Sequence, residues 1–185
     1  CLIGLHSPFL ASAHAFERMG VNAIPEALAD KLALHLSLRV DASIVQTNIV
    51  GHTGASGFVR LARQALFDGA IESGADYFLV DDFIGQGGTL ANLKGFIESR
   101  GGRVIGATVL TGRAYSAKLN LFPEQLAALR AKHGHEFELW WHDRFGHGFD
   151  CLTQSEARYL ERSPDAERIR NSLVEAEQTG NCRSA

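Results

Sequence analysis

Residues 77–93, YFLVDDFIGQGGTLANL, decide how the rest of the chain is interpreted. Four apolar residues lead into two adjacent acids, Asp81 and Asp82, and a glycine-rich segment follows before a helix-like pattern. Two carboxylates side by side at the end of an apolar strand repel each other unless a ligand or their neighbours compensate the charge. Glycines allow backbone N–H groups to approach an anion closely. The order of these features predicts a ligand with hydroxyls or a metal at one end and a phosphate at the other.

The chain on either side of this stretch alternates between strand-like and helix-like patterns. Strands are predicted where apolar or β-branched residues follow one another, at residues 2–5, 43–50, 77–80, 104–110 and 137–141. Helices are predicted at residues 25–36, 58–67, 89–99, 123–133 and 153–162, the last with a capping box of Thr153 and Glu156. Because hydrophobicity within the strands is continuous, the expected fold class is α/β, a parallel β-sheet with helices on both faces. We expect one domain over residues 1–160 and a polar C-terminal helix or tail over 161–185.

The composition argues against several classes of protein. A chain of 185 residues is long enough for one domain with a complete core and short for two. The formal net charge of −3 argues against a nucleic-acid partner bound through bulk electrostatics. No apolar run approaches the length of a membrane span, so no membrane partner is expected. The cysteines have no disulfide or metal spacing, which favours a cytoplasmic location; they are Cys1, Cys151 and Cys182.

The expected phosphate-binding segment is the glycine-rich turn between strand and helix. In parallel α/β sheets, ligands bind outside the carboxyl ends of the strands, where Asp81 and Asp82 are expected. A phosphate there would meet the N–H groups and the dipole at the start of the next helix. Neither a Walker A motif nor the dinucleotide fingerprint places two acids directly before its glycines. The residues predicted to bind the phosphate are Gly85, Gln86, Gly87, Gly88 and Thr89.

Residues 79–89, LVDDFIGQGGT, resemble the phosphoribosyl pyrophosphate (PRPP) motif of type I phosphoribosyltransferases. The resemblance implies that Asp81 and Asp82 are the catalytic acids, which hold the ribose 2′- and 3′-hydroxyls with Mg²⁺ nearby. It also implies that Thr89 and the glycines before it cradle the 5′-phosphate. It implies the fold of that family over residues 1–110, and a cytoplasmic, homodimeric enzyme of nucleotide metabolism.

Two further features bear on this resemblance. The order of an early strand, a His-Ser-Pro turn, Asn22, Arg60 and Gln64 is loosely similar to ComF-like phosphoribosyltransferase proteins. Gly85 stands where 6-oxopurine enzymes of the family carry an Asp that assists the purine, so hypoxanthine or guanine is not expected as substrate. Gln86 still offers its backbone N–H and its amide to a phosphate.

Two segments before the motif have two interpretations each. The turn at His6 and Ser7 lies where the family's pyrophosphate loop would follow the first strand, or it is a plain surface turn. Residues 51–57 form either a mobile lid, in which Thr53 and Ser56 reach the pyrophosphate, or a solvated loop. The sequence leaves both alternatives open.

Other polar residues also have two interpretations. Arg60 and Arg63 bind pyrophosphate or form a pair on the surface of a helix. Residues 132–151 contain four histidines, two aspartates and a cysteine, in spacings that match no zinc template. A structural or interface role is therefore expected for this stretch, with a metal site as the alternative. Trp140 and Trp141 cover a nucleobase or divide between core and surface.

The predicted function is that of a phosphoribosyltransferase, which transfers the phosphoribosyl group between PRPP and a nitrogenous base and releases pyrophosphate. Its ligands would be Mg²⁺ with PRPP or a nucleoside 5′-monophosphate, and Asp81 and Asp82 would stabilise positive charge developing on the ribose. One alternative is a non-catalytic regulatory or accessory protein that binds PRPP or a nucleotide through the same fold. Another is a partner-binding module with a vestigial site. The base is not predicted, because the segments that select it are variable.

Overall fold

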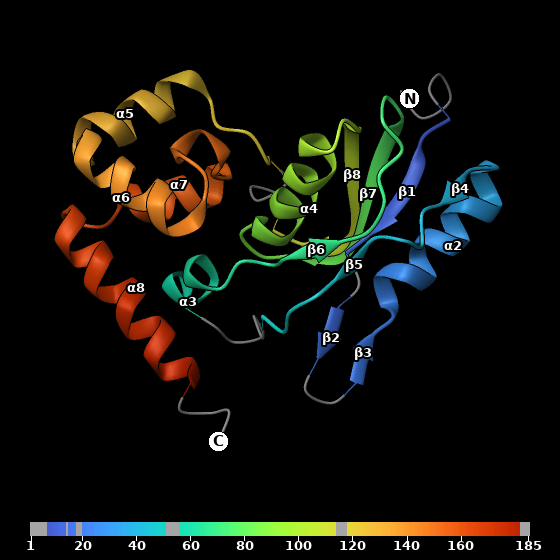
Figure 1. Ribbon diagram of the computed structural model, residues 1–185, viewed down its shortest axis with the longest axis horizontal. Helices are drawn as coiled ribbons and strands as arrows, with labels where there is room; N and C mark the ends of the chain where they lie inside the picture. The colour runs from blue at the N-terminus through green and yellow to red at the C-terminus, as the bar shows by residue number, and fades with distance from the viewer. Residues whose placement is uncertain (1–6, 14, 18–19, 51–55, 114–117, 182–185) are drawn as a thin grey trace. The chain divides into compact units, whose positions relative to one another are not determined.

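The computed structural model describes residues 7–13, 15–17, 20–50, 56–113 and 118–181 (Figure 1). By its contacts the chain divides into two compact units. The sheet unit comprises Cys1–Gly51, Ala65–Gly85 and Thr89–Arg113, and the helical unit comprises His52–Gln64, Gln86–Gly88 and Ala114–Ala185. The boundaries between the units therefore do not fall at residue 160.

A four-stranded parallel sheet forms the centre of the sheet unit, as the α/β prediction requires. Its strand order is β4 (Arg39–Val40), β1 (Phe9–Ser12), β7 (Asp76–Ile84) and β8 (Arg103–Gly112). All three neighbouring pairs are parallel. β7 pairs with β1 through Tyr77 to Val80 and with β8 along almost its full length. The strand that carries both acids is therefore held on both of its edges.

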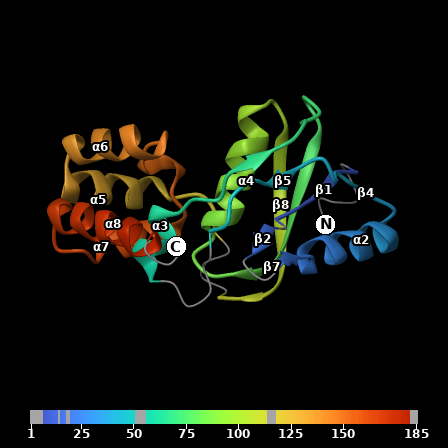
Figure 2. The same ribbon diagram turned by 60° about the horizontal axis from the view of Figure 1, so that its bottom comes forward.

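Helices α2 (Ile24–Leu36) and α4 (Gly88–Ser99) cover opposite faces of this sheet (Figures 1 and 2). On the α2 face, Leu10 and Val80 are buried in a cluster with residues of α2. Side chains alternate along a strand, so Leu79 points to the α4 face, where it is fully buried. Burial on both faces explains why the start of β7 is an uninterrupted apolar run.

Two short antiparallel pairs lie outside the main sheet, β2 (Ala15–Glu17) with β3 (Gly20–Asn22) and β5 (Val45–Gln46) with β6 (Phe67–Asp68). The strand predicted at residues 43–50 is therefore mostly wrong, because only β5 forms there. Asp41 Oδ1 accepts hydrogen bonds from the N–H and the hydroxyl of Ser43, at 3.0 and 2.6 Å. Such local bonds turn the backbone and compete with strand pairing.

The helical unit contains the remaining elements, which are α3 (Gly57–Ala62), α5 (Pro123–His133), α6 (His135–Phe145), the 3-10 helix η2 (Phe149–Cys151), α7 (Gln154–Glu161) and α8 (Ala166–Asn181). Its core is a single buried cluster that includes Leu61, Trp141, Phe149 and Leu160. Ile169 and Leu173 of α8 are fully buried in the same cluster. The polar C-terminal segment is thus a helix, and one face of it completes this core.

The strand predicted at residues 137–141 is wrong, because this segment lies within α6. Phe137, Trp141 and Phe145 recur every four residues, which is the spacing of one face of a helix. Phe137 and Trp141 are 1% and 0% exposed. The segment FELWW at residues 137–141 is too short to show its period, and only the flanking residues reveal it.

Most other predicted elements are confirmed. The helices expected at 25–36, 89–99, 123–133 and 153–162 are α2, α4, α5 and α7, and the strand at 104–110 is β8. The helix expected at 58–67 is α3, which ends at Ala62. The strand expected at residues 2–5 lies outside the described residues. Within the described part of the chain, no helix has the length and apolar character that a membrane span needs.

We expect Leu79→Ala to lower the free energy of unfolding by about 2–5 kcal/mol, because it leaves a cavity beneath α4. Leu110 of β8 is 59% exposed and serves as the matched control. Leu110→Ala should change the same quantity by less than about 0.5 kcal/mol. Urea unfolding followed by circular dichroism measures both. Equal losses in the two variants would contradict the assignment of Leu79 to the core.

Candidate functional site

Strand β7 continues through both acids and ends at Ile84, four residues beyond the predicted end at Val80. Asp81 lies opposite Val109 of β8, and Ile84 lies opposite Gly112. The extension follows from the length of β8, which offers pairing partners as far as Gly112. The two acids therefore lie within the last four residues of the strand, near its carboxyl end but still inside the sheet.

Asp81 is a buried acid whose pKa is raised above its ordinary value. Its side chain is turned toward its own strand, where Oδ1 accepts the N–H of Asp82 at 2.8 Å. Burial raises the pKa of Asp81 to about 8, and the adjacent Asp82 carboxylate raises it as well. Hydrogen bonds from the backbone of Asp82 and Phe83 act in the opposite direction. A protonated carboxyl can donate a hydrogen bond as well as accept one.

Asp82 is partly buried and is held by a residue that is 60 positions earlier in the chain. Asn22 Nδ2 donates a hydrogen bond to Asp82 Oδ2 at 3.0 Å. Asn22 ends β3, directly before α2, so the short hairpin and the helix place it beside β7. In the sequence, Asn22 is only one of several residues whose order resembles ComF-like proteins, and no contact was predicted for it. No local pattern predicts this pairing, because the partners come together only when the sheet forms.

The glycine-rich segment connects β7 to α4. Gly87 has φ +88°, a conformation that residues with a side chain rarely adopt. α4 begins at Gly88, one residue earlier than predicted, so Thr89 lies in its first turn. The first N–H groups of a helix have no partner within the helix, and they favour an anion. The local geometry is therefore compatible with the predicted phosphate contact.

Residues 86–88 of this segment belong to the helical unit, and within that unit helix α7 contacts them. Thr153 is the N-cap of α7, and its Oγ1 donates a hydrogen bond to the Gln86 carbonyl oxygen at 2.7 Å. A Cβ atom placed on Gly88 would lie 2.6 Å from Glu156 Oε1. Gly88 is therefore required by the close approach of Glu156. The capping box was predicted from the sequence, but its contact with the glycine-rich segment was not.

Glu156 is a second buried acid close to this segment. Its carboxylate accepts the N–H of Thr153 at 2.8 Å, which completes the capping box. Burial raises the pKa of Glu156 to about 7, and the hydrogen bonds with Thr153 lower it by a smaller amount. Burial therefore favours the protonated form of Glu156.

The structure describes only some of the other predicted site residues. His6 and Thr53 lie outside the described residues. Ser7 is exposed and directly precedes β1, at the amino end of that strand rather than after it. Ser56 is the N-cap of α3, and its Oγ accepts the N–H of Val59 at 3.4 Å. The predicted pyrophosphate and lid roles of these residues stay predictions.

The carboxyl end of the predicted lid is fixed within the helical unit. A Cβ atom on Gly57 would lie 2.3 Å from the ring of Tyr159, so only glycine fits there. Arg60 follows in α3 and is partly buried. Its predicted contact with pyrophosphate stays a prediction.

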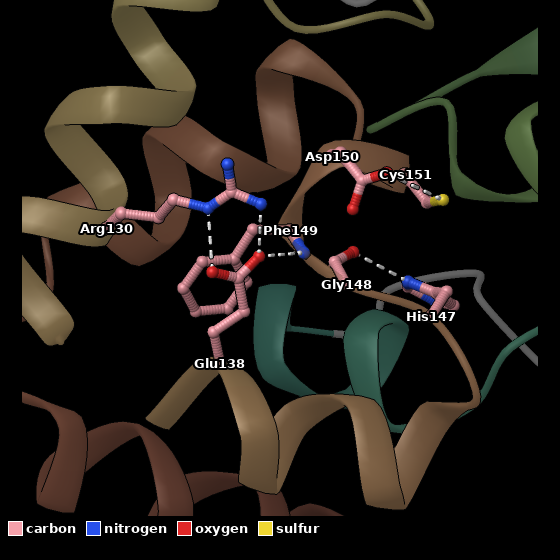
Figure 3. Close-up of polar contacts among 7 residues, drawn as sticks. All are labelled: Arg130, Glu138, His147, Gly148, Phe149, Asp150 and Cys151. Atoms are coloured by element: carbon pink, nitrogen blue, oxygen red, sulfur yellow. Dashed lines mark hydrogen bonds and ion pairs between the residues drawn. The ribbon is translucent and has the colours of Figure 1, made fainter. Parts of the chain in front are cut away.

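Residues of the histidine-rich stretch line a pocket of about 700 Å³ in the helical unit. Arg130 donates two hydrogen bonds to Glu138, at 2.7 and 2.8 Å, and Phe149 N–H donates to the same carboxylate at 3.2 Å. His147 contacts the carbonyl oxygen of Gly148 (Figure 3). The residues that the structure describes contain no cluster of three or more His, Cys, Asp or Glu able to hold a metal ion.

We expect the stability of the protein to fall as pH rises from about 4.5 to 7, in part because of Glu156. The folded-state pKa lies above the ordinary value, so the unfolded chain releases this proton first. A shift of this size corresponds to a loss on the order of 3 kcal/mol over that window. Glu156→Gln should remove this part of the pH dependence. Glu124→Gln, at an exposed position on α5, should leave it intact.

Urea unfolding at pH 5, 6, 7 and 8 provides the measurement for all three proteins. If the wild type and Glu156→Gln lose stability in parallel across this range, Glu156 is not the buried acid that the structure indicates.

This chain is similar in sequence to parts of two longer proteins. No protein-family model matches this sequence. Protein TraN of Escherichia coli is 39% identical over 175 residues, which is 95% of this chain and 39% of TraN. An uncharacterized protein of Haemophilus influenzae is 43% identical over 96 residues, 52% of this chain and 22% of that protein. The chain thus spans less than half the length of either relative.

One solved structure shows a limited likeness. The crystal structure of an adenine phosphoribosyltransferase superposes with a TM-score of 0.41 and 16% sequence identity, covering 59% of each chain. A likeness of this extent does not establish a common fold. What the structure itself establishes is an α/β protein with a four-stranded parallel sheet.

Proposed function

We propose that this chain binds PRPP or a nucleoside 5′-monophosphate and acts as a phosphoribosyltransferase. In the proposed reaction, the bond between ribose C1 and the pyrophosphate oxygen breaks as a nitrogen of the base bonds to C1. The single observation that carries the proposal is the placement of the motif LVDDFIGQGGT. Its acids lie in the last four residues of a parallel strand, and its glycines lead directly into a helix. That is the edge where parallel sheets bind ligands.

The two acids support this function in different ways. One oxygen of Asp82 is bound by a neutral amide, which leaves the charge of the carboxylate available to a ribose hydroxyl or a metal. The raised pKa of Asp81 favours its protonated form, which can donate a hydrogen bond to an oxygen. A donor beside an acceptor suits a vicinal diol, whose hydroxyls each donate and accept.

The glycine-rich segment supports the phosphate end of the proposal. Its backbone N–H groups and the start of α4 favour an anion. Binding the phosphate there would fix the ribose relative to Asp82 and leave C1 oriented for attack. Thr89, in the first turn of α4, adds a hydroxyl donor.

A magnesium ion is part of the proposal. Carboxylates and phosphate oxygens are the ligands that Mg²⁺ prefers, and it usually binds through one or two carboxylates together with substrate phosphates. The partly buried Asp82 fits that role, whereas Asp81 fits it after losing its proton. Bound there, the ion would offset the negative charge of the pyrophosphate as it leaves.

We expect Asp82→Asn to weaken binding of PRPP at least tenfold, because a hydrogen bond to a charged acceptor contributes about 1.5–3 kcal/mol. Asp30→Asn, at an exposed position on α2, is the matched control and should bind as the wild type does. Titration calorimetry with Mg²⁺ present measures both. Equal affinity in Asp82→Asn and the wild type would contradict the assignment of the site.

Release of pyrophosphate decides between catalysis and regulation. The wild type is incubated with PRPP, Mg²⁺ and a panel of purine and pyrimidine bases. Turnover with one base, lost in Asp82→Asn, supports the enzyme. PRPP binding without turnover across the whole panel supports the alternative, a regulatory or accessory protein.

A further inference from the structure

We propose that Asn22 is a positioning residue for the Asp82 carboxylate, and that it makes recognition of ribose hydroxyls depend on the β2–β3 hairpin. The inference rests on the proposed function and assigns a role within the same site. It starts from the hydrogen bond of 3.0 Å between Asn22 Nδ2 and Asp82 Oδ2.

The orientation of the Asn22 amide is fixed from both ends. Its oxygen, Oδ1, accepts the N–H of Ile24 at 3.3 Å, at the start of α2. A backbone N–H can only donate, so the oxygen of the amide must face α2. The NH₂ group then has to face Asp82, as the structure has it. The two neighbours thus exclude the flipped amide that often makes an Asn ambiguous.

The fixed amide restrains the Asp82 carboxylate through one of its oxygens, Oδ2. Asn22 binds Oδ2, so the carboxylate loses rotational freedom before the ligand arrives. Ordering a side chain in advance lowers the entropy that binding would otherwise cost. An amide carries no charge, so it orients the carboxylate without neutralising it. A lysine or arginine at this position would form an ion pair with Asp82 and compete with a metal or hydroxyl.

The position of the hairpin fits this role. Among the described residues, β2 and β3 form a separate two-stranded sheet, in which Ala15 pairs with Asn22 and Glu17 with Gly20. β3 ends at Asn22 itself, and α2 follows after one residue. Asn22 is thus placed by the hairpin on one side and by the helix on the other.

The test uses two probes that differ only in the hydroxyls. These are ribose 5-phosphate and its 2,3-dideoxy analogue, titrated into the wild type and its variants. The wild type should prefer ribose 5-phosphate. Asn22→Ala should lower that preference roughly tenfold while the affinity for the dideoxy analogue stays unchanged, because Asn22 acts only through Asp82. Asn171→Ala, at an exposed position on α8, should keep the full preference.

An exchanged pair separates positioning from a structural role. In the double variant Asn22→Asp with Asp82→Asn, the amide and the carboxylate trade places and can still form one hydrogen bond. The melting temperature should recover relative to Asn22→Asp alone, where two carboxylates face each other. The preference for ribose 5-phosphate should not recover, because the carboxylate has left position 82.

Each other outcome overturns the proposal. If Asp82→Asn abolishes the preference and Asn22→Ala keeps it, the proposed function stands and the role of Asn22 is wrong. If Asn22→Ala weakens both probes equally, Asn22 only stabilises the fold. If the wild type shows no preference for ribose 5-phosphate, the ribose-binding function fails, and the role of Asn22 fails with it.

Discussion

The pairing of β7 with both of its neighbours is the constraint on which the rest of the structure depends. It buries Leu79 and Val80 on opposite faces of the sheet. Because the pairing continues to Ile84, Asp81 is buried as well. Burial then raises the pKa of Asp81 to about 8. One strand thereby organises the core of the sheet unit and raises the pKa of an acid that lies within it.

The ends of the candidate site are held by different parts of the chain. Asn22 binds the Asp82 carboxylate within the sheet unit, and Thr153 binds the Gln86 carbonyl within the helical unit. Gly88 lies against the buried Glu156. Neutral donors are used at both hydrogen bonds, so the contacts order the site without adding a cation that would compete with a metal. Its geometry is therefore a property of residues far apart in sequence.

The two strands that were wrongly predicted from the sequence, at residues 137–141 and 43–50, have a common cause. The segment 137–141 has the composition of a strand, yet Phe137 and Trp141 face one core as part of α6. In the segment 43–50, Asp41 and a turn at Ser43 limit the strand to two residues. A short apolar run fits either period, and its surroundings in the folded chain choose between them.

The sequence by itself determined the parallel α/β class, the order strand–acids–glycines–helix, and the capping box of α7. These depend on local composition and spacing, which do not change when distant segments meet. Only the tertiary structure decided that β7 includes both acids, that the pKa of Asp81 is raised, and that Asn22 binds Asp82. Strand length depends on the neighbouring strand, protonation depends on burial, and the Asn22 contact joins residues 60 positions apart. The strand length, the burial of Asp81 and the Asn22 contact all arise only when the sheet forms.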